Sequence, residues 1–92
     1  MLVIAFGKAK AGTVQERLAR RAQWQYPPGL RVVAEYWPQG GDYNVIVIAE
    51  ADSAVSLLAA TAPWSDLYDF TIAPVITAEE GLRVAPQFMK AA

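Results

Sequence analysis

Two short stretches of this 92-residue sequence are apolar at consecutive positions, and they constrain the fold more than any other feature. They are residues 2–6 and residues 45–48, and both contain β-branched side chains. Because successive side chains of a strand point to opposite faces of its sheet, a strand that is apolar throughout is buried on both faces. Both stretches are therefore predicted to be central strands of a sheet that needs cover on each side.

An amphipathic helix is predicted between these strands. Residues 11–26 carry apolar side chains four positions apart, which places them on one helical face. Thr13 and Glu16 have the spacing of a capping box, and Pro27 cannot extend the helix. Three arginines share another side of this helix, where they could attract an anion, although a solubilising face is the commoner role: Arg17, Arg20 and Arg21.

The middle of the chain has the pattern of a hairpin. Residues 30–37 are predicted to form a half-exposed edge strand with Arg31 and Glu35 on one face. A turn rich in proline and glycine follows and leads into the second central strand, over residues 43–50.

The last third of the chain supplies the remaining elements. A second helix is predicted to begin at Asp52 or Ser53, and residues 67–76 form a strand in which Pro74 belongs at an edge or an end. A short helix follows from Thr77, and the tail to Ala92 is expected to fray or to pack on a partner.

This order predicts an α+β fold of the ferredoxin-like βαββαβ type, with a four-stranded antiparallel sheet in one domain spanning residues 1–92. Both helices cover the same face of such a sheet. No third helix of adequate length remains to cover the other face, and a symmetric partner is the commonest solution in oligomers. The sequence therefore predicts a homodimer packed through the open sheet face.

Several short motifs resemble the dimeric α/β-barrel superfamily. They are Gly-Asp-Tyr-Asn at 41–44, Trp-Ser-Asp-Leu at 64–67, Ala-Pro-Val at 73–75 and Glu-Glu at 79–80. The chain is most similar to small stand-alone bacterial domains of unknown function, with the GYD domains as looser relatives, although Asn44 stands where those have aspartate. The resemblance implies a dimer, and activities in the superfamily include cofactor-independent isomerases and oxygenases.

Composition excludes several chemistries. Without histidine the chain lacks the usual neutral-pH base and the proximal haem ligand, and without cysteine it has no thiolate metal site, so no metal or other cofactor is expected. The absence of cysteine permits a reducing compartment, and a cytoplasmic location is expected. A net charge of −1 argues against nucleic acid, and no apolar stretch approaches the ~20 residues of a membrane helix.

The candidate site consists of aromatic and carboxylate side chains near the hairpin and near the last strand. Asp69, Glu35 and Tyr43 are the candidates for acid–base catalysis. The candidate ligand-binding residues are Arg31, Tyr36, Trp37, Trp64 and Phe70.

Plainer roles stay open for the same residues. The hairpin aromatics suit a dimer interface, Asp69 suits a water-facing edge, and Arg31 with Glu35 suits a solvated ion pair. The sequence thus predicts a homodimeric small-molecule-binding domain, either an isomerase- or monooxygenase-like enzyme or a plain binder. The alternative is a non-catalytic regulatory or protein-interaction module.

Overall fold

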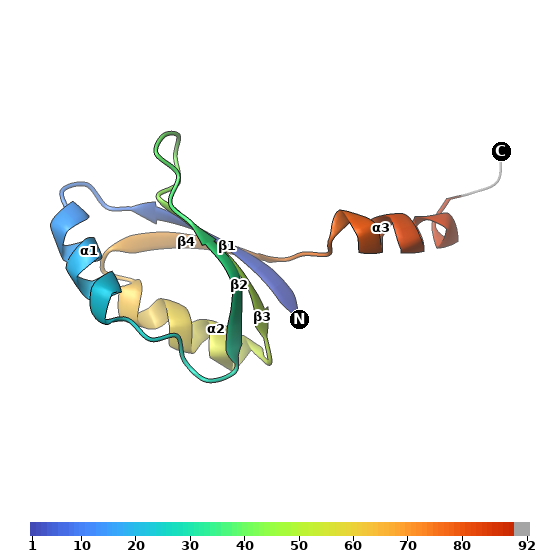
Figure 1. Ribbon diagram of the computed structural model, residues 1–92, viewed down its shortest axis with the longest axis horizontal. Helices are drawn as coiled ribbons and strands as arrows, with labels where there is room; N and C mark the ends of the chain where they lie inside the picture. The colour runs from blue at the N-terminus through green and yellow to red at the C-terminus, as the bar shows by residue number, and fades with distance from the viewer. Residues whose placement is uncertain (90–92) are drawn as a thin grey trace.

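The predicted sheet is present in the computed structural model, which describes residues 1–89. Four antiparallel strands lie in the order β2-β3-β1-β4, and helices α1 and α2 lie on one side of them (Figure 1). This arrangement confirms the ferredoxin-like α+β fold. The elements are β1 Leu2–Ala9, α1 Val14–Gln23, β2 Leu30–Tyr36, β3 Val45–Ala51, α2 Ala54–Thr61, η1 Ala62–Trp64, β4 Tyr68–Pro74, α3 Ala78–Val84 and η2 Ala85–Gln87.

The two strands predicted to be central are central. β1 pairs with β3 on one side and with β4 on the other, while β3 pairs with β1 and β2. Alternate residues of these strands face the helices, and the small core gathers there around Val3, Ala49 and Ala51. Partly buried side chains packed against that core are Leu30, Val47, Leu57 and Ile72.

A β-bulge in β2 changes which side chains face the helices. Leu30 to Val32 pair residue by residue with β3, but the register shifts between Val32 and Ala34. One extra residue inverts the alternation that follows it. Arg31 is therefore paired with Glu50 on the open side, whereas Glu35 is paired with Val47 on the helix side. The prediction that Arg31 and Glu35 share a face is wrong for this reason.

The helix starts differ from one another in how they are capped. Thr13 does not form the predicted capping box, because its hydroxyl donates to the carbonyl of Lys10 at 2.7 Å and accepts from Nε of Arg17 at 3.0 Å. Ser53 precedes α2 without a side-chain cap. Thr77 does cap α3, since its hydroxyl accepts from the backbone N–H of Glu80 at 3.0 Å.

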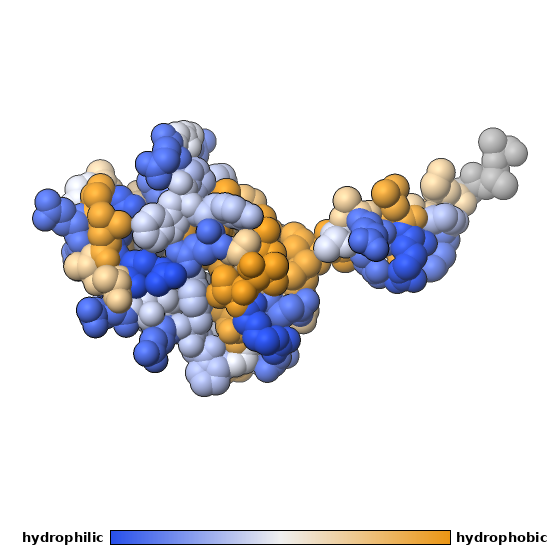
Figure 2. Space-filling model, in the orientation of Figure 1, coloured by the Kyte–Doolittle hydropathy of each residue, from blue (hydrophilic) through white to orange (hydrophobic). Residues whose placement is uncertain are grey.

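Within residues 1–89 no helix lies on the second face of the sheet (Figure 1). We call it the open sheet face. Its side chains are mostly apolar, and Figure 2 shows hydrophobic surface over the strands. The residues of the open sheet face are Leu2, Ile4, Phe6, Lys8, Arg31, Ala34, Tyr36, Ile46, Ile48, Glu50, Asp69, Thr71 and Ala73.

The C-terminal part of the chain projects away from the sheet. Residues 75–89, which we call the arm, include α3 and η2 and extend to one side of the body (Figure 1). Leu82 is 77% exposed and Phe88 is 79% exposed, so the arm holds large apolar side chains in water. The end of the predicted fraying tail, residues 90–92, lies outside the described residues. Within residues 1–89 no helix has the length and apolar character to cross a membrane.

Gly7 lets β1 approach its neighbours closely. A Cβ at this position would lie 2.5 Å from Cγ1 of Val45, 3.0 Å from the Tyr68 ring and 3.1 Å from the Phe70 ring.

We expect Gly7→Ala to lower the free energy of unfolding by about 1–3 kcal/mol through overpacking, measured by urea denaturation. Gly40→Ala is the control, because nothing lies within 4 Å of a Cβ there. Equal stability of the two variants would contradict the close packing.

Candidate functional site

A cavity of about 440 Å³ lies between the helices and the sheet. This volume is within the range of small-molecule sites, about 300–1,000 Å³. The sheet contributes Ala5, Val47 and Ile72 from three different strands, and α2 contributes Ala60. Short side chains on both sides leave room that larger ones would fill.

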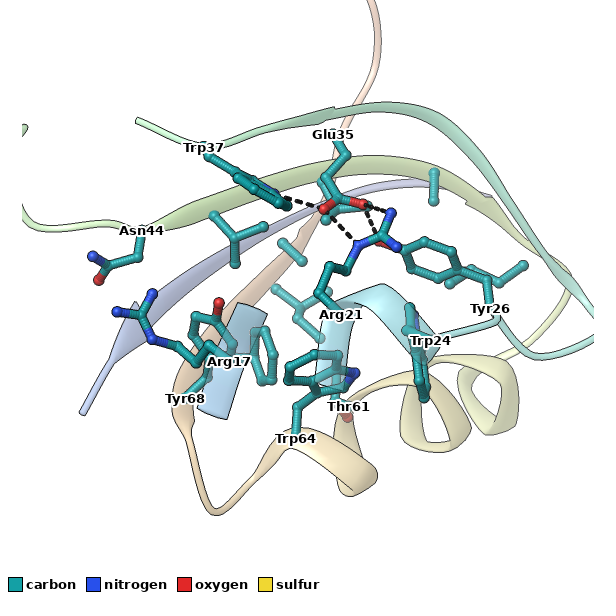
Figure 3. A pocket seen from close by; sticks show the side chains of 18 of the residues that line it. Arg17, Arg21, Trp24, Tyr26, Glu35, Trp37, Asn44, Thr61, Trp64 and Tyr68 are labelled. Carbon is teal, nitrogen blue, oxygen red and sulfur yellow. Dashed lines mark hydrogen bonds and ion pairs between the residues drawn. The ribbon is translucent and has the colours of Figure 1, made fainter. Parts of the chain in front are cut away.

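The cavity exists because α1 does not close on the sheet. No residue of α1 is buried, and its apolar residues Val14 and Leu18 remain 55% and 51% exposed although both border the cavity. Arg17 and Arg21 point into the same space (Figure 3). Long charged side chains between helix and sheet hold the two apart, because their charged groups need polar partners rather than apolar contact.

One side of the cavity is a continuous row of aromatic rings, which we call the aromatic wall: Trp24, Tyr26, Trp64, Tyr68 and Phe70. Trp24 lies edge-on to Trp64 at 5.5 Å between ring centroids, and Trp64 lies edge-on to Tyr68 at 5.8 Å. Tyr68 stacks on Phe70 at 5.3 Å. Such pairs are favourable beyond their buried area, so the wall is a preformed apolar surface.

The opposite side holds a half-buried carboxylate. Glu35, whose side chain is 13% exposed, accepts four hydrogen bonds (Figure 3). Arg21 donates two of them at 3.0 Å, Tyr26 donates one from its hydroxyl at 2.6 Å, and Trp37 donates one from its indole at 2.7 Å. We call these four residues the Glu35 network. It joins α1, the segment after α1 and the end of β2.

The charges of this network support one another. Burial acts to raise the pKa of Glu35, but the hydrogen bonds from Arg21, Tyr26 and Trp37 outweigh it and hold that pKa below its ordinary value. Burial, together with its hydrogen bond to Glu35, raises the pKa of Tyr26. The hydrogen bond to Glu35 likewise raises the pKa of Arg21. Glu35 is therefore an anion with both oxygens occupied, which suits an anchor better than a proton acceptor.

A second arginine contact positions the aromatic wall. Arg20 donates to both oxygens of Asp66, at 2.7 and 2.9 Å, and to the carbonyl of Pro63 at 2.8 Å. Its guanidinium also lies 5.5 Å from the centroid of the Trp64 ring. The hydrogen bond from Arg20 lowers the pKa of Asp66. The prediction of a solubilising arginine face on α1 is thus wrong for Arg20 and Arg21, because these two arginines bind Asp66 and Glu35 on other elements.

The structure separates the predicted site residues into two groups. Four of them border the cavity: Glu35, Trp37, Trp64 and Phe70. The other four lie elsewhere: Arg31, Tyr36, Tyr43 and Asp69.

The four outside the cavity have other neighbours. Tyr43 packs on Phe6 at 5.0 Å between ring centroids, and Tyr36 is paired with Ile46 on the open sheet face. Asp69 is exposed and is paired with Lys8, while Arg31 contacts Asp52 at 3.2 Å. The structure therefore places these side chains apart from the aromatic wall.

The residues of the cavity that were not among the predicted site residues include Arg17, Arg21, Trp24, Tyr26, Asn44 and Tyr68. The arginines were expected on a solvated face. Trp24 and Tyr26 directly precede Pro27 and Pro28, and aromatic residues at the exit of an amphipathic helix are a signal that could have indicated a wall.

In the described part of the chain, the cavity presents arginine, tyrosine and amide groups together with a single carboxylate. Glu35 is the one carboxylate among the described lining residues, and its oxygens are occupied. Within residues 1–89 no three acidic, histidine or cysteine side chains lie together in a way that could hold a metal ion. Aromatic and aliphatic surface with a few fixed polar groups remains.

Fold and cavity define the class of protein, an α+β domain of ferredoxin-like topology with a cavity between its sheet and its two covering helices. A family model described as "Domain of unknown function (DUF3303)" matches residues 1–89, and the chain belongs to this family. No match was found among curated proteins or among solved structures. The predicted resemblance to domains of unknown function is confirmed, while the link to GYD domains stays a prediction.

Glu35→Gln tests the network. The variant keeps the shape but loses the charge, and it points an amide N–H₂ at hydrogen-bond donors, so we expect the free energy of unfolding to fall by about 2–4 kcal/mol at pH 7. Because the pKa of Glu35 is lowered in the folded state, its contribution is complete above the unfolded pKa of about 4 and is lost as the pH falls through the folded pKa.

The difference between wild type and Glu35→Gln should accordingly shrink below about pH 4, measured by urea denaturation across the acid range. Glu79→Gln is the control, because Glu79 is exposed at the start of α3. A difference that stays constant with pH would contradict the ionised network.

Proposed function

We propose that this chain is a homodimeric small-molecule-binding domain whose ligand occupies the cavity between sheet and helices. The observation that carries the proposal is the cavity itself, about 440 Å³ in volume and bordered by all three tryptophans of the chain. Ligand sites combine an apolar lining with a few polar groups, and this cavity has both. The cavity lies on the helix side of the sheet. It is therefore a different space from the one that two sheets would enclose between their open sheet faces in a dimer.

Binding without turnover fits the polar groups better than catalysis does. An isomerase- or monooxygenase-like reaction needs an acid–base group that is open to the ligand. Glu35 is held by four donors, and Asp69 and Tyr43 lie outside the cavity. A module that senses a metabolite needs only the cavity, so a regulatory binder is the form of the function that we favour.

The open sheet face and the arm support the homodimer. Ile4, Phe6 and Ile48 lie on the two central strands, on the face that no helix of the described residues covers. The arm carries exposed apolar side chains, among them Leu82 and Phe88, and Figure 2 shows hydrophobic patches on it beside hydrophilic surface. A second copy can cover both surfaces at once, because a twofold arrangement presents the same face and the same arm from each chain.

Ligand binding is tested by filling the cavity. N-phenyl-1-naphthylamine is a neutral dye whose fluorescence rises in apolar surroundings, and we expect the wild-type protein to bind it with saturation. Ala60→Phe adds a ring to the cavity and should reduce dye affinity about tenfold or more through loss of apolar contact. Ala59→Phe is the matched control, because the neighbouring residue is exposed and outside the cavity. Equal loss in both variants, or no binding by the wild type, would refute the proposal.

The homodimer is tested by sedimentation equilibrium over a hundredfold range of concentration. We expect the wild type to have twice the mass of one chain, and Ile48→Lys to be monomeric because it places a charge in the centre of the open sheet face. Val55→Lys is the control, since Val55 is 73% exposed on α2, away from that face. Circular dichroism establishes that each variant is folded. A monomeric wild type, or a dimeric Ile48→Lys, would contradict the interface.

A further inference from the structure

One end of the cavity gathers hydrogen-bond donors without an acidic partner. Arg17, Asn44 and Tyr68 come from α1, from the residue before β3 and from the start of β4, and all three border the cavity. We call them the donor cluster. Figure 3 shows the three side chains together, apart from the Glu35 network at the other end.

The sheet brings this cluster together at Ala9. The backbone N–H of Ala9 donates to Oδ1 of Asn44 at 2.8 Å, and Ala9 is paired with Tyr68 on the neighbouring strand. Asn44 and Tyr68 therefore flank the same residue of β1. The guanidinium of Arg17 lies over the Tyr68 ring, 5.7 Å from its centroid. The pairing of strands around Ala9 thus explains why the three side chains of the donor cluster lie close together although they come from different segments.

The orientation of Asn44 is determined by its partner. Because an N–H group needs an acceptor, Oδ1 must face Ala9, and the amide N–H₂ of this cavity-bordering residue is left as a donor. Among residues 1–89 Arg17 donates only from Nε, to the hydroxyl of Thr13. Its two Nη groups have no hydrogen-bond partner in the part of the chain that the structure describes, so the cluster offers several donors to a ligand.

The charge of the cavity is uneven. At one end the positive charge of Arg21 is matched by Glu35, at 3.0 Å. At the other end Arg17 forms no ion pair within residues 1–89, and no acidic side chain belongs to the cluster. A guanidinium beside apolar walls attracts an anion more strongly than one in water, since the surroundings screen the charge less.

We infer that the ligand is an aromatic monocarboxylate, with its carboxylate at the donor cluster and its ring system along the aromatic wall. This inference rests on the proposed small-molecule function and names the ligand class. Arg17 supplies the charge, the Asn44 amide supplies a second donor, and Trp64 and Phe70 supply ring contacts. A carboxylate accepts several hydrogen bonds at once, which matches donors that converge from different segments.

The experiment compares two competitors that share one ring system. 2-Naphthoate carries a carboxylate and 2-naphthamide is its neutral counterpart, and each is titrated against bound N-phenyl-1-naphthylamine at pH 7. We expect 2-naphthoate to displace the dye at a concentration about tenfold or more below that of 2-naphthamide, as one charge-assisted hydrogen bond implies.

Three variants test which residues cause the preference for 2-naphthoate over 2-naphthamide. Arg17→Met keeps the length of the side chain and removes the charge, and Asn44→Asp keeps the acceptor for Ala9 but replaces the donor with a carboxylate. Both should bind the neutral dye and lose the preference for 2-naphthoate. Arg31→Met is the control, because Arg31 is an exposed arginine outside the cavity, and it should keep the preference.

The outcomes separate the two proposals. Dye binding with equal displacement by both competitors would overturn the carboxylate inference and leave the proposed function standing. The carboxylate inference alone is also overturned if Arg17→Met and Asn44→Asp keep the preference. Failure of the wild type to bind the dye or either competitor would overturn both. Loss of the preference in Arg31→Met as well would assign it to overall charge and overturn the inference.

Discussion

The hydrogen bonds around Glu35 are the interaction on which the arrangement of this domain depends. A carboxylate that is mostly withdrawn from water is costly unless donors surround it, and here four hydrogen bonds do so. These donors come from α1, from the segment before β2 and from the residue after β2. The network therefore sets the distance between helix and sheet at one end of the cavity. An apolar residue at position 35 would favour collapse of the helix onto the strands.

The network in turn depends on a single extra residue in β2. Without the bulge between Val32 and Ala34, Glu35 would project from the open side, together with Arg31. The alternation of apolar and polar residues predicted the strand and its place at an edge, because burial patterns repeat every two residues. It could not predict the bulge, since residues 30–37 contain side chains that suit either face. Two partners that Glu35 meets on the helix side, Arg21 and Tyr26, lie 14 and 9 residues earlier in the chain and leave no signal within the strand itself.

The sequence could predict the parts of the fold that depend on local signals, and it could not predict those that depend on contacts between distant residues. Continuous apolar strands and proline or glycine boundaries are local signals, and they indicated the order of elements and the two central strands. The role of the α1 arginines was not local. Arg20 and Arg21 were expected to face solvent because charge on a helix face is usually hydrated, but their partners Asp66 and Glu35 lie on distant elements. Long-range ion pairs of this kind leave no periodic trace in a sequence.

The two central strands link the cavity to the open sheet face. In β1, Val3 and Ala5 border the cavity, while Ile4 and Phe6 project from the opposite side. The same alternation in β3 gives Val47 to the cavity and Ile48 to the open sheet face. Under the proposed function, each strand is apolar on both sides for two different reasons, because one side would contact the ligand and the other side would contact the second chain. Because the strands are shared, a ligand that orders β1 and β3 would lower the entropy cost of covering their other face, and ligand and partner would favour each other's binding.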